Sequence, residues 1–213
     1  MQHWVSVEQD GVSGTVMPLD TPLLTLGDIN RGAWPKEFGA RPGTVFSYVM
    51  NNYWHTNYRA AQGGQFQFRY VVTSAASTTA AALSRMGWEE VTPLEEDEIT
   101  TQDKALDWPG PLDGKQASFL RVDDPDLLLD TWKPAEDGDG TILRFIDLGG
   151  APRKVTVTVP ILAINRALET DAVERNQRSL PVEEDHRFAF EIRPHEIVTI
   201  RLAGNPVLKI PAP

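Results

Sequence analysis

The stretch HRFAFEIRPHEIVTIRL, His186–Leu202, consists of two runs of alternating apolar and polar side chains, separated by a short polar turn. The apolar positions in the two runs are Phe188, Phe190, Ile192, Val198, Ile200 and Leu202. A repeat of two residues is that of a β-strand with one buried face. The stretch therefore predicts two strands that belong to the core of a sheet protein.

A similar run, QFQFRYVV at Gln65–Val72, predicts a strand in the N-terminal half. Thr44–Met50 is rich in β-branched and aromatic residues and lies between turn residues, which favours a neighbouring strand. Alanines cluster in Ser77–Met86 before Gly87, which indicates one short helix that ends at the glycine. A second, weaker helical pattern begins after Pro160. Further strands are predicted at Trp4–Val7, Pro22–Leu26, Ser118–Val122, Leu127–Trp132, Thr141–Ile146 and Lys154–Val159.

These short strands predict an all-β fold, an antiparallel β-sandwich with one short helix. An acidic segment that is poor in apolar residues interrupts the strand pattern. We therefore expect three parts: an N-terminal β-sheet part at residues 1–90, an acidic linker at 91–115 and a C-terminal β-sandwich at 116–213. The N-terminal part has too few strands to close a large sandwich alone. We expect it to expose an apolar edge or face and to complete a larger sheet with strands from elsewhere.

The composition excludes several classes of function. The net charge is −10, and residues 87–139 hold sixteen acids against four bases, so we expect neither nucleic acid nor an acidic membrane as a partner. The sequence has no cysteine, which excludes disulfides and thiolate chemistry and fits a reducing compartment. No apolar run is long enough to span a bilayer, and Met1–Asp10 lacks the pattern of a secretion signal. We therefore expect a cytoplasmic protein.

Motifs of common enzymes and metal sites are also missing. The sequence has no phosphate-binding glycine loop, no dinucleotide fingerprint and no nucleophile elbow. The run EDGDG at Glu136–Gly140 does not keep the ligand spacing of a calcium loop, and Asp-Gly between strand-like runs predicts a hairpin turn instead. His186 and His195 lie near two different strands, and a surface pair across the sheet is favoured over a metal site.

A connection rich in asparagine and aromatic residues, Asn51–Gly64, joins the two N-terminal strands. Aromatic faces and planar amides are the groups that bind the C–H surfaces and hydroxyls of sugars. The alternative is a scaffold loop whose asparagines satisfy turns and whose aromatic rings pack on the sheet. The candidate residues for carbohydrate contact are Asn52, Tyr53, Asn57, Tyr58, Arg59 and Gln62.

Several longer segments resemble the C-terminal region of glycoside hydrolase family 38, the α-mannosidase family. They are PLLTLGDINRGAWP at 22–35, GTVFSYVMNNYWHTNY at 43–58 with QGG at 62–64 and FQFRY at 66–70, KPAEDGDGTILRF at 133–145, and PHEIVTIRL at 194–202. The resemblance implies a supersandwich-like N-terminal part plus a smaller C-terminal sandwich. It also implies a role in an enzyme whose zinc ion and aspartate nucleophile lie in an N-terminal catalytic domain.

No catalytic residue and no metal ligand of that family is matched in this sequence, so we expect no cofactor here and zinc only in the catalytic domain. Three functions remain open. The first is the non-catalytic β region of an α-mannosidase-like hydrolase, which supports the catalytic domain and lines its sugar cleft. The second is a stand-alone carbohydrate-binding module. The third is a docking subunit for a separate catalytic chain. We expect the isolated chain to be inactive, with the catalytic domain or chain and a mannoside or related glycan as partners.

Overall fold

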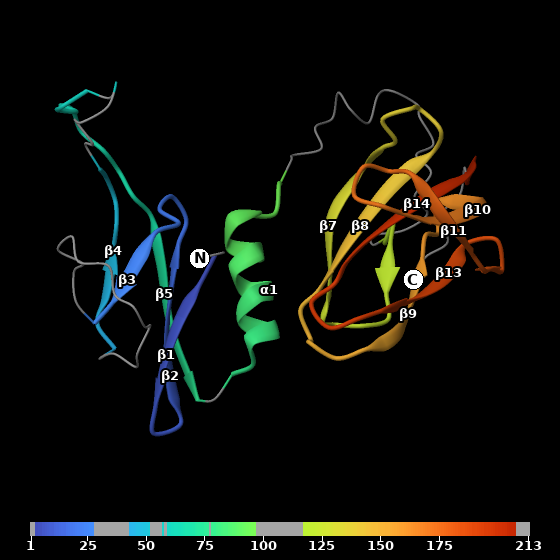
Figure 1. Ribbon diagram of the computed structural model, residues 1–213. Coiled ribbons are helices and arrows are strands. Elements are labelled where there is room, and N and C mark those ends of the chain that lie inside the picture. Colours follow the sequence, from blue (N-terminus) through green and yellow to red (C-terminus); the bar gives the residue numbers. More distant parts are fainter. Residues whose placement is uncertain are drawn as a thin grey trace, which may run out of the picture. The chain divides into compact units, whose positions relative to one another are not determined.

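The computed structural model describes residues 3–27, 43–51, 57, 59–76, 78–96 and 117–207. The chain divides into two compact units, Met1–Leu94 and Glu95–Pro213, each of which is described by itself (Figure 1). The described residues form several antiparallel sheets and one short helix, so the predicted all-β class is confirmed. No helix among them is long and apolar enough to cross a membrane.

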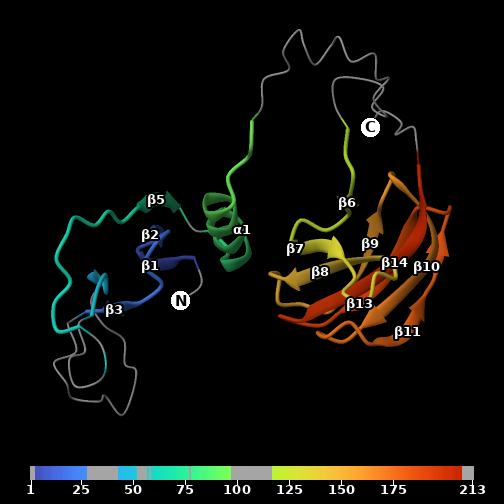
Figure 2. The same cartoon turned by 90° about the horizontal axis from the view of Figure 1, so that it is seen from above.

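The second unit is a β-sandwich of two antiparallel sheets (Figures 1 and 2). One sheet has five strands in the order β11 (Asn176–Leu180), β10 (Leu162–Thr170), β14 (Ile197–Pro206), β8 (Thr141–Asp147) and β7 (Leu127–Pro134). The other has four strands in the order β12 (Val182–Glu183), β13 (Arg187–Ile192), β9 (Arg153–Thr158) and β6 (Arg121–Val122). Such a pair of sheets buries the inward-facing side chains of both between them.

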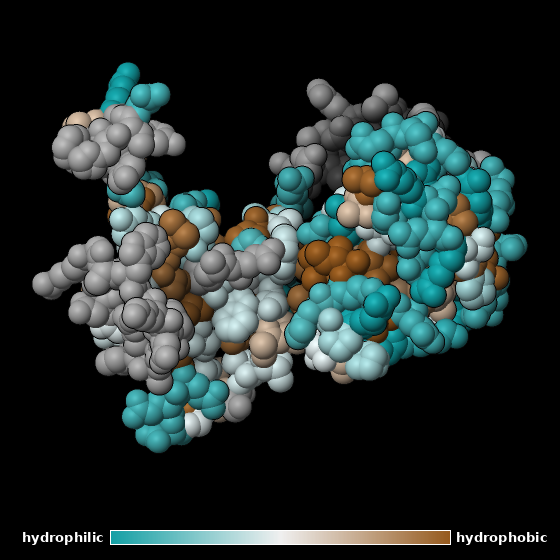
Figure 3. All heavy atoms as spheres, viewed as in Figure 1, coloured by the Kyte–Doolittle hydropathy of each residue, from teal (hydrophilic) through white to brown (hydrophobic). Residues whose placement is uncertain are grey.

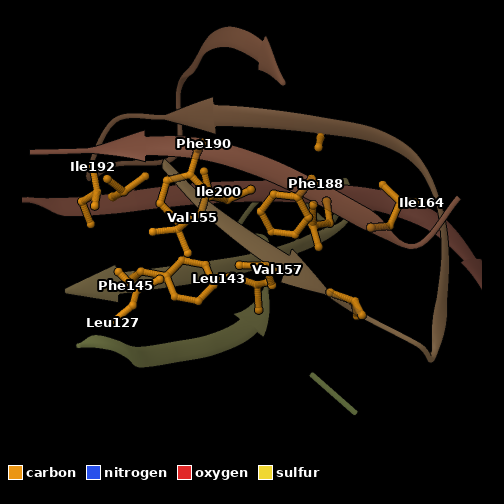
Figure 4. Packing of buried hydrophobic residues seen from close by; sticks show 14 residues of the cluster. Leu127, Leu143, Phe145, Val155, Val157, Ile164, Phe188, Phe190, Ile192 and Ile200 are labelled. Atoms are coloured by element: carbon orange, nitrogen blue, oxygen red, sulfur yellow. The ribbon is translucent and has the colours of Figure 1, made fainter. Parts of the chain in front are cut away.

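The core of the sandwich is one cluster of apolar side chains from both sheets (Figure 4). Phe145 of β8 lies against Phe190 of β13, with ring centroids 5.5 Å apart, and Phe188 stacks on Phe190 at 6.2 Å. The alternation predicted in His186–Leu202 is confirmed, because its six apolar positions are all buried in this cluster. Alternating side chains of β13 and β14 thus join the two sheets.

The first unit holds a smaller sheet, with the strand order β1 (Val5–Gln9), β2 (Val12–Pro18) and β5 (Tyr70–Ala76). A separate pair of short strands, β3 (Leu24–Leu26) and β4 (Val45–Ser47), is also antiparallel. The helix α1 (Ala80–Val91) begins after Thr79, whose side-chain oxygen accepts from the amide of Ala82 at 3.1 Å. It is tied to the start of β1 because Trp4 Nε1 donates to Ser84 Oγ at 3.1 Å.

Several local predictions for this unit need correction. Only the end of the alternating run is a strand, since β5 starts at Tyr70 and residues 65–69 are not in a ladder. The helix runs through Gly87 to Val91 instead of ending at the glycine. Gly87 is needed for close packing, because a Cβ there would lie 2.9 Å from the Cβ of His3. Ser77, the predicted first residue of the helix, lies outside the described residues.

In the second unit, the weak helix predicted after Pro160 is wrong, because that segment forms β10. Its apolar side chains pack into the sandwich core, and this tertiary burial outweighs local propensity. The predicted contact between His186 and His195 is also wrong. They lie at opposite ends of β13, and that strand separates them by about 20 Å at its usual rise per residue. Strands β2, β11 and β12 were not predicted at all.

The hairpin turn predicted at Glu136–Gly140 is confirmed between β7 and β8. Gly138 and Gly140 have φ angles of 77° and 96°, the left-handed region that glycine adopts without cost. Arg201 on β14 anchors the turn: its Nη1 donates to Asp137 Oδ1 at 2.7 Å and to the Asp139 carbonyl at 2.9 Å. This hydrogen bonding by Arg201 holds the pKa of the Asp137 carboxyl below its usual value.

A pair of glycine substitutions tests this turn. In Gly140→Ala the new Cβ would lie 2.2 Å from the Leu202 carbonyl oxygen, so strain adds to the cost of the positive φ. In Gly138→Ala nothing lies within 4 Å and only the φ cost remains. We expect Gly138→Ala to lower the free energy of unfolding by about 1 kcal/mol and Gly140→Ala by roughly 3 kcal/mol or more. Urea denaturation measures both, and equal losses would contradict the close packing of Gly140.

A buried carboxylate joins three turns at one end of the sandwich. The Asp147 side chain is fully buried and accepts from the amides of Gly149 at 3.0 Å, Gly150 at 2.9 Å and His195 at 2.7 Å. The Arg153 guanidinium pairs with it and with Asp124. Burial by itself raises the pKa of Asp147, but the hydrogen bonds from Arg153 and from the three amides outweigh burial and hold that pKa below its usual value.

Removing this charge should destabilise the protein. We expect Asp147→Asn to lower the free energy of unfolding by about 2–4 kcal/mol at neutral pH, because Arg153 loses a buried partner. The exposed Asp130→Asn is the control, with a change of less than about 0.5 kcal/mol. Because the pKa of Asp147 is lower in the folded than in the unfolded protein, its stabilising contribution is fully present above the usual aspartate pKa of about 3.9. That contribution is lost as the pH falls through the folded pKa. The difference in free energy of unfolding between wild type and Asp147→Asn should therefore narrow in that acidic range. A difference that stays constant with pH would contradict an ionised Asp147 in the folded protein.

Candidate functional site

The sequence-predicted sugar-contact residues lie on the connection between β4 and β5. Asn57, Arg59 and Gln62 are exposed, so none of these three side chains is packed in the core of its unit. Asn52, Tyr53 and Tyr58 lie outside the described residues. Amides and a guanidinium on an exposed connection can donate to and accept from ligand hydroxyls. The assignment of these six residues to carbohydrate contact stays a prediction.

Two polar clusters hold the ends of this connection together. At one end, Tyr70 Oη lies 2.8 Å from Ser47 Oγ, and Thr21 Oγ1 is within reach of both hydroxyls at 3.0 and 3.3 Å. Beside it, Arg69 donates to Asp20 through its guanidinium at 2.8 Å and its backbone amide at 2.7 Å. Because Ser47 precedes the connection and Arg69 and Tyr70 end it, the chain leaves and re-enters the sheet region at fixed points.

The ion pair between Asp20 and Arg69 also sets the local electrostatics. The hydrogen bonds from the Arg69 side chain and amide hold the pKa of the Asp20 carboxyl below its usual range, and the carboxylate raises the pKa of Arg69 in return. The Asp20 side chain is 28% exposed and that of Arg69 is 65% exposed, so salt screens this pair and it adds little to stability. The pair therefore positions the chain. Because the pKa of Asp20 is lowered, its carboxyl is not suited to act as a general acid, which needs a raised pKa.

The sheet of the first unit presents an apolar face. Residues opposite each other in an antiparallel ladder share a face, and Val16 is paired with Val72 and Pro18 with Tyr70. On this face Val72 is 73% exposed and Val12 57% exposed. Figure 3 shows hydrophobic side chains, in brown, at the surface of the first unit. The described residues thus leave two valines of this face exposed, and the larger exposed face expected for the N-terminal part stays a prediction.

The opposite face of the same sheet is covered. Ser13, Thr15 and Met17 are buried there, and Thr15 Oγ1 donates to Ser6 Oγ at 3.0 Å. Trp4 continues the side-chain direction of Ser6, and its bond to Ser84 places α1 over this face. Among the described residues of the first unit, the buried hydrophobic side chains are Met17 and Leu83, both on or over this face.

A cavity of about 310 Å³ at one end of the sandwich was not indicated by the sequence. Its lining residues are Arg121, Thr158, Pro160, Leu162, Ala163, Asp185, His186 and Val207. They come from β6, β9, β10, the turn between β12 and β13, and the residue after β14. Because these segments are distant in sequence, no local motif could have revealed the cavity.

In the described part of the chain, no three side chains of His, Cys, Asp or Glu gather as they would around a metal ion. The acidic residues that do cluster, at the turn between β7 and β8, are paired with Arg201, Arg166 and Lys133. Their charges stabilise the end of the sandwich.

Comparison with known proteins identifies the sandwich. Residues 126–200 match the family model described as Glycosyl hydrolases family 38 C-terminal beta sandwich domain. A search of curated proteins returned no match to the chain. The matched residues begin just before β7 and end within β14, so they cover most of the two sheets. The resemblance is thereby confirmed for this part of the sequence: residues 126–200 match the C-terminal β-sandwich domain of glycosyl hydrolase family 38.

Proposed function

We propose that the chain is the non-catalytic C-terminal β region of an α-mannosidase-like glycoside hydrolase. In this role it supports the catalytic domain and, through the connection that carries Asn57 and Arg59, lines the sugar cleft. The family domain at residues 126–200 carries the proposal, because it is a domain of a larger glycoside hydrolase. The zinc ion and the catalytic residues then belong to the catalytic partner, and this chain contributes no cofactor.

The first unit supplies the contact with that partner in this proposal. Its sheet has one face covered by α1 and another on which Val72 and Val12 are exposed, and few hydrophobic side chains are buried among its described residues. Strands β1 and β5 are the edges of the sheet, and within the described residues neither pairs with a further strand on its outer side, where we propose that a strand of another polypeptide adds. Addition of partner strands would complete the larger β-sandwich that we expect for residues 1–90.

Hydrolysis of an aryl α-mannoside tests the proposed role. The chain alone should give no turnover, with or without zinc, because retaining hydrolysis needs a placed nucleophile and acid. Mixed or co-expressed with a family 38 catalytic polypeptide from the same organism, it should raise the activity or the yield of folded catalytic polypeptide. Turnover by the pure chain that a chelator abolishes would refute the non-catalytic role.

The apolar face gives a mutational prediction. Val72→Asp should leave the fold intact, since the side chain is largely exposed, and should weaken association with the catalytic polypeptide by about tenfold to a hundredfold, because the charge loses its water in the interface. Val173→Asp is the matched control, because Val173 is 67% exposed but lies in the second unit, between β10 and β11. Analytical ultracentrifugation of the mixtures measures both; an equal effect of the two variants would reject the docking face.

The proposed sugar contact has its own test in the assembled enzyme. Asn57→Ala and Arg59→Ala should each lower kcat/KM for a mannoside about threefold to tenfold, the usual effect of one hydrogen bond, without a change in melting temperature. Gln65→Ala is the control, because Gln65 is exposed on the same connection but is not a candidate contact. Unchanged kinetics with a lower melting temperature would make the connection a scaffold.

A stand-alone carbohydrate-binding module is the second candidate. The exposed amide and guanidinium groups at Asn57, Arg59 and Gln62 are the observation in its favour. Binding of a mannoside by the chain without any catalytic polypeptide, combined with no association in the experiment above, would favour it over the supporting role. A docking subunit, the remaining alternative, would associate with the catalytic polypeptide and would be encoded separately from it.

A further inference from the structure

The cavity at the end of the sandwich is built on fixed backbone. The amide of Val159 donates to the His186 carbonyl at 2.8 Å, and the amide of Val207 to the Ile161 carbonyl at 2.8 Å. Arg121 is paired in register with Thr158. Each wall is therefore hydrogen-bonded to another wall, and the volume of about 310 Å³ falls at the lower end of the range of ligand pockets, ~300–1,000 Å³. The cavity is preformed and has the size for a ligand of one or two rings.

The turn that carries two of the lining residues has an unusual backbone. Glu184 and Asp185 have φ angles of 51° and 58°, and the amide of His186 donates to the Glu183 carbonyl at 3.3 Å. Two consecutive left-handed residues are typical of a hairpin turn that favours Asn-Gly, where a glycine would remove the steric cost. Residues other than glycine at positive φ cost conformational free energy, and such strained backbone is concentrated at ligand sites.

The cavity is lined by one cationic and one anionic side chain and by two further polar side chains. Arg121 and Asp185 form no ion pair with any other described residue, so a cation and an anion both remain available to a ligand. The His186 imidazole and the Thr158 hydroxyl add further donors and acceptors. An anionic ligand would be attracted by Arg121 and repelled by Asp185, and a cationic ligand the reverse, so neither gains as much as it would from a single opposite charge. Pro160, Leu162 and Val207 supply an apolar wall.

We propose that this cavity binds one neutral sugar residue. Its hydroxyls would bond to Arg121 and Asp185 from one side, and its C–H face would lie on Leu162 and Val207. A neutral molecule with many hydroxyls and one apolar face can use all of these groups, whereas a hydrocarbon would form no hydrogen bond with the exposed Arg121 and Asp185. The inference goes beyond the proposed function, because it concerns the end of the sandwich and neither the apolar face of the first unit nor the connection after β4.

Titration of the full chain with four small sugars, followed by amide chemical shifts, tests the proposal. Methyl α-mannopyranoside and methyl α-glucopyranoside are the neutral probes, glucuronate is the anionic analogue and glucosamine the cationic one. We expect a neutral probe to bind at about millimolar concentration, as a ligand of this size allows, and to shift the amides of Ala163 and His186. Both charged analogues should bind at least about fivefold more weakly. No shift with either neutral probe, or tighter binding of a charged analogue, overturns the proposal.

Two variants localise the binding. Arg121→Gln and Asp185→Asn each remove one charge, and asparagine keeps the left-handed backbone accessible. Each should weaken binding of the neutral sugar about tenfold, the loss expected for a hydrogen bond to a charged group, with an unchanged melting temperature. Glu191→Gln is the control, because Glu191 is an exposed acid on β13 outside the cavity. If both variants bind like wild type, or if Glu191→Gln weakens binding equally, the sugar does not occupy this cavity.

Discussion

The second unit depends on one shared layer of apolar side chains between two sheets. Inward-facing residues of β8 and β14 meet those of β9 and β13, and each strand has one face in this layer and one face directed away from it. Neither sheet could bury its apolar face alone, so the two form together. Phe145, Phe188 and Phe190 fill the centre, and the turns that carry polar groups are arranged around this layer.

Buried ions fasten the ends of the sandwich. The Asp147 carboxylate accepts hydrogen bonds from three backbone amides and pairs with Arg153. The Arg201 guanidinium donates to Asp137 in the turn and to the carbonyl of Glu174 at 2.9 Å. Each charge is removed from water and is compensated by several partners, which is the condition for a buried ion to be tolerated. Their hydrogen bonds fix the turns between strands.

The first unit follows a different physical pattern. Its sheet has a covered face, under α1, and an apolar face on which Val72 is exposed. Gly43 and Ser47 lie beside that face, against Val7 and Tyr70, but Val72 stays exposed among the described residues, so this face is covered less completely than the inner faces of the sandwich. A sheet of this kind gains stability by burying its free face against another polypeptide. This difference between the units is the basis of the proposed supporting role.

Sequence alone determined the class of fold, the hairpin at Glu136–Gly140 and the strands of His186–Leu202, because alternation and Asp-Gly turns are local signals. It did not determine that residues 65–69 stay outside a ladder or that the segment after Pro160 becomes β10, since pairing partners and burial outweigh local propensity. The exposed positions of Asn57, Arg59 and Gln62, the separation of His186 from His195, and the cavity between Arg121 and Asp185 were decided by the tertiary structure. Each depends on which segments, distant in sequence, the shared apolar layer brings together.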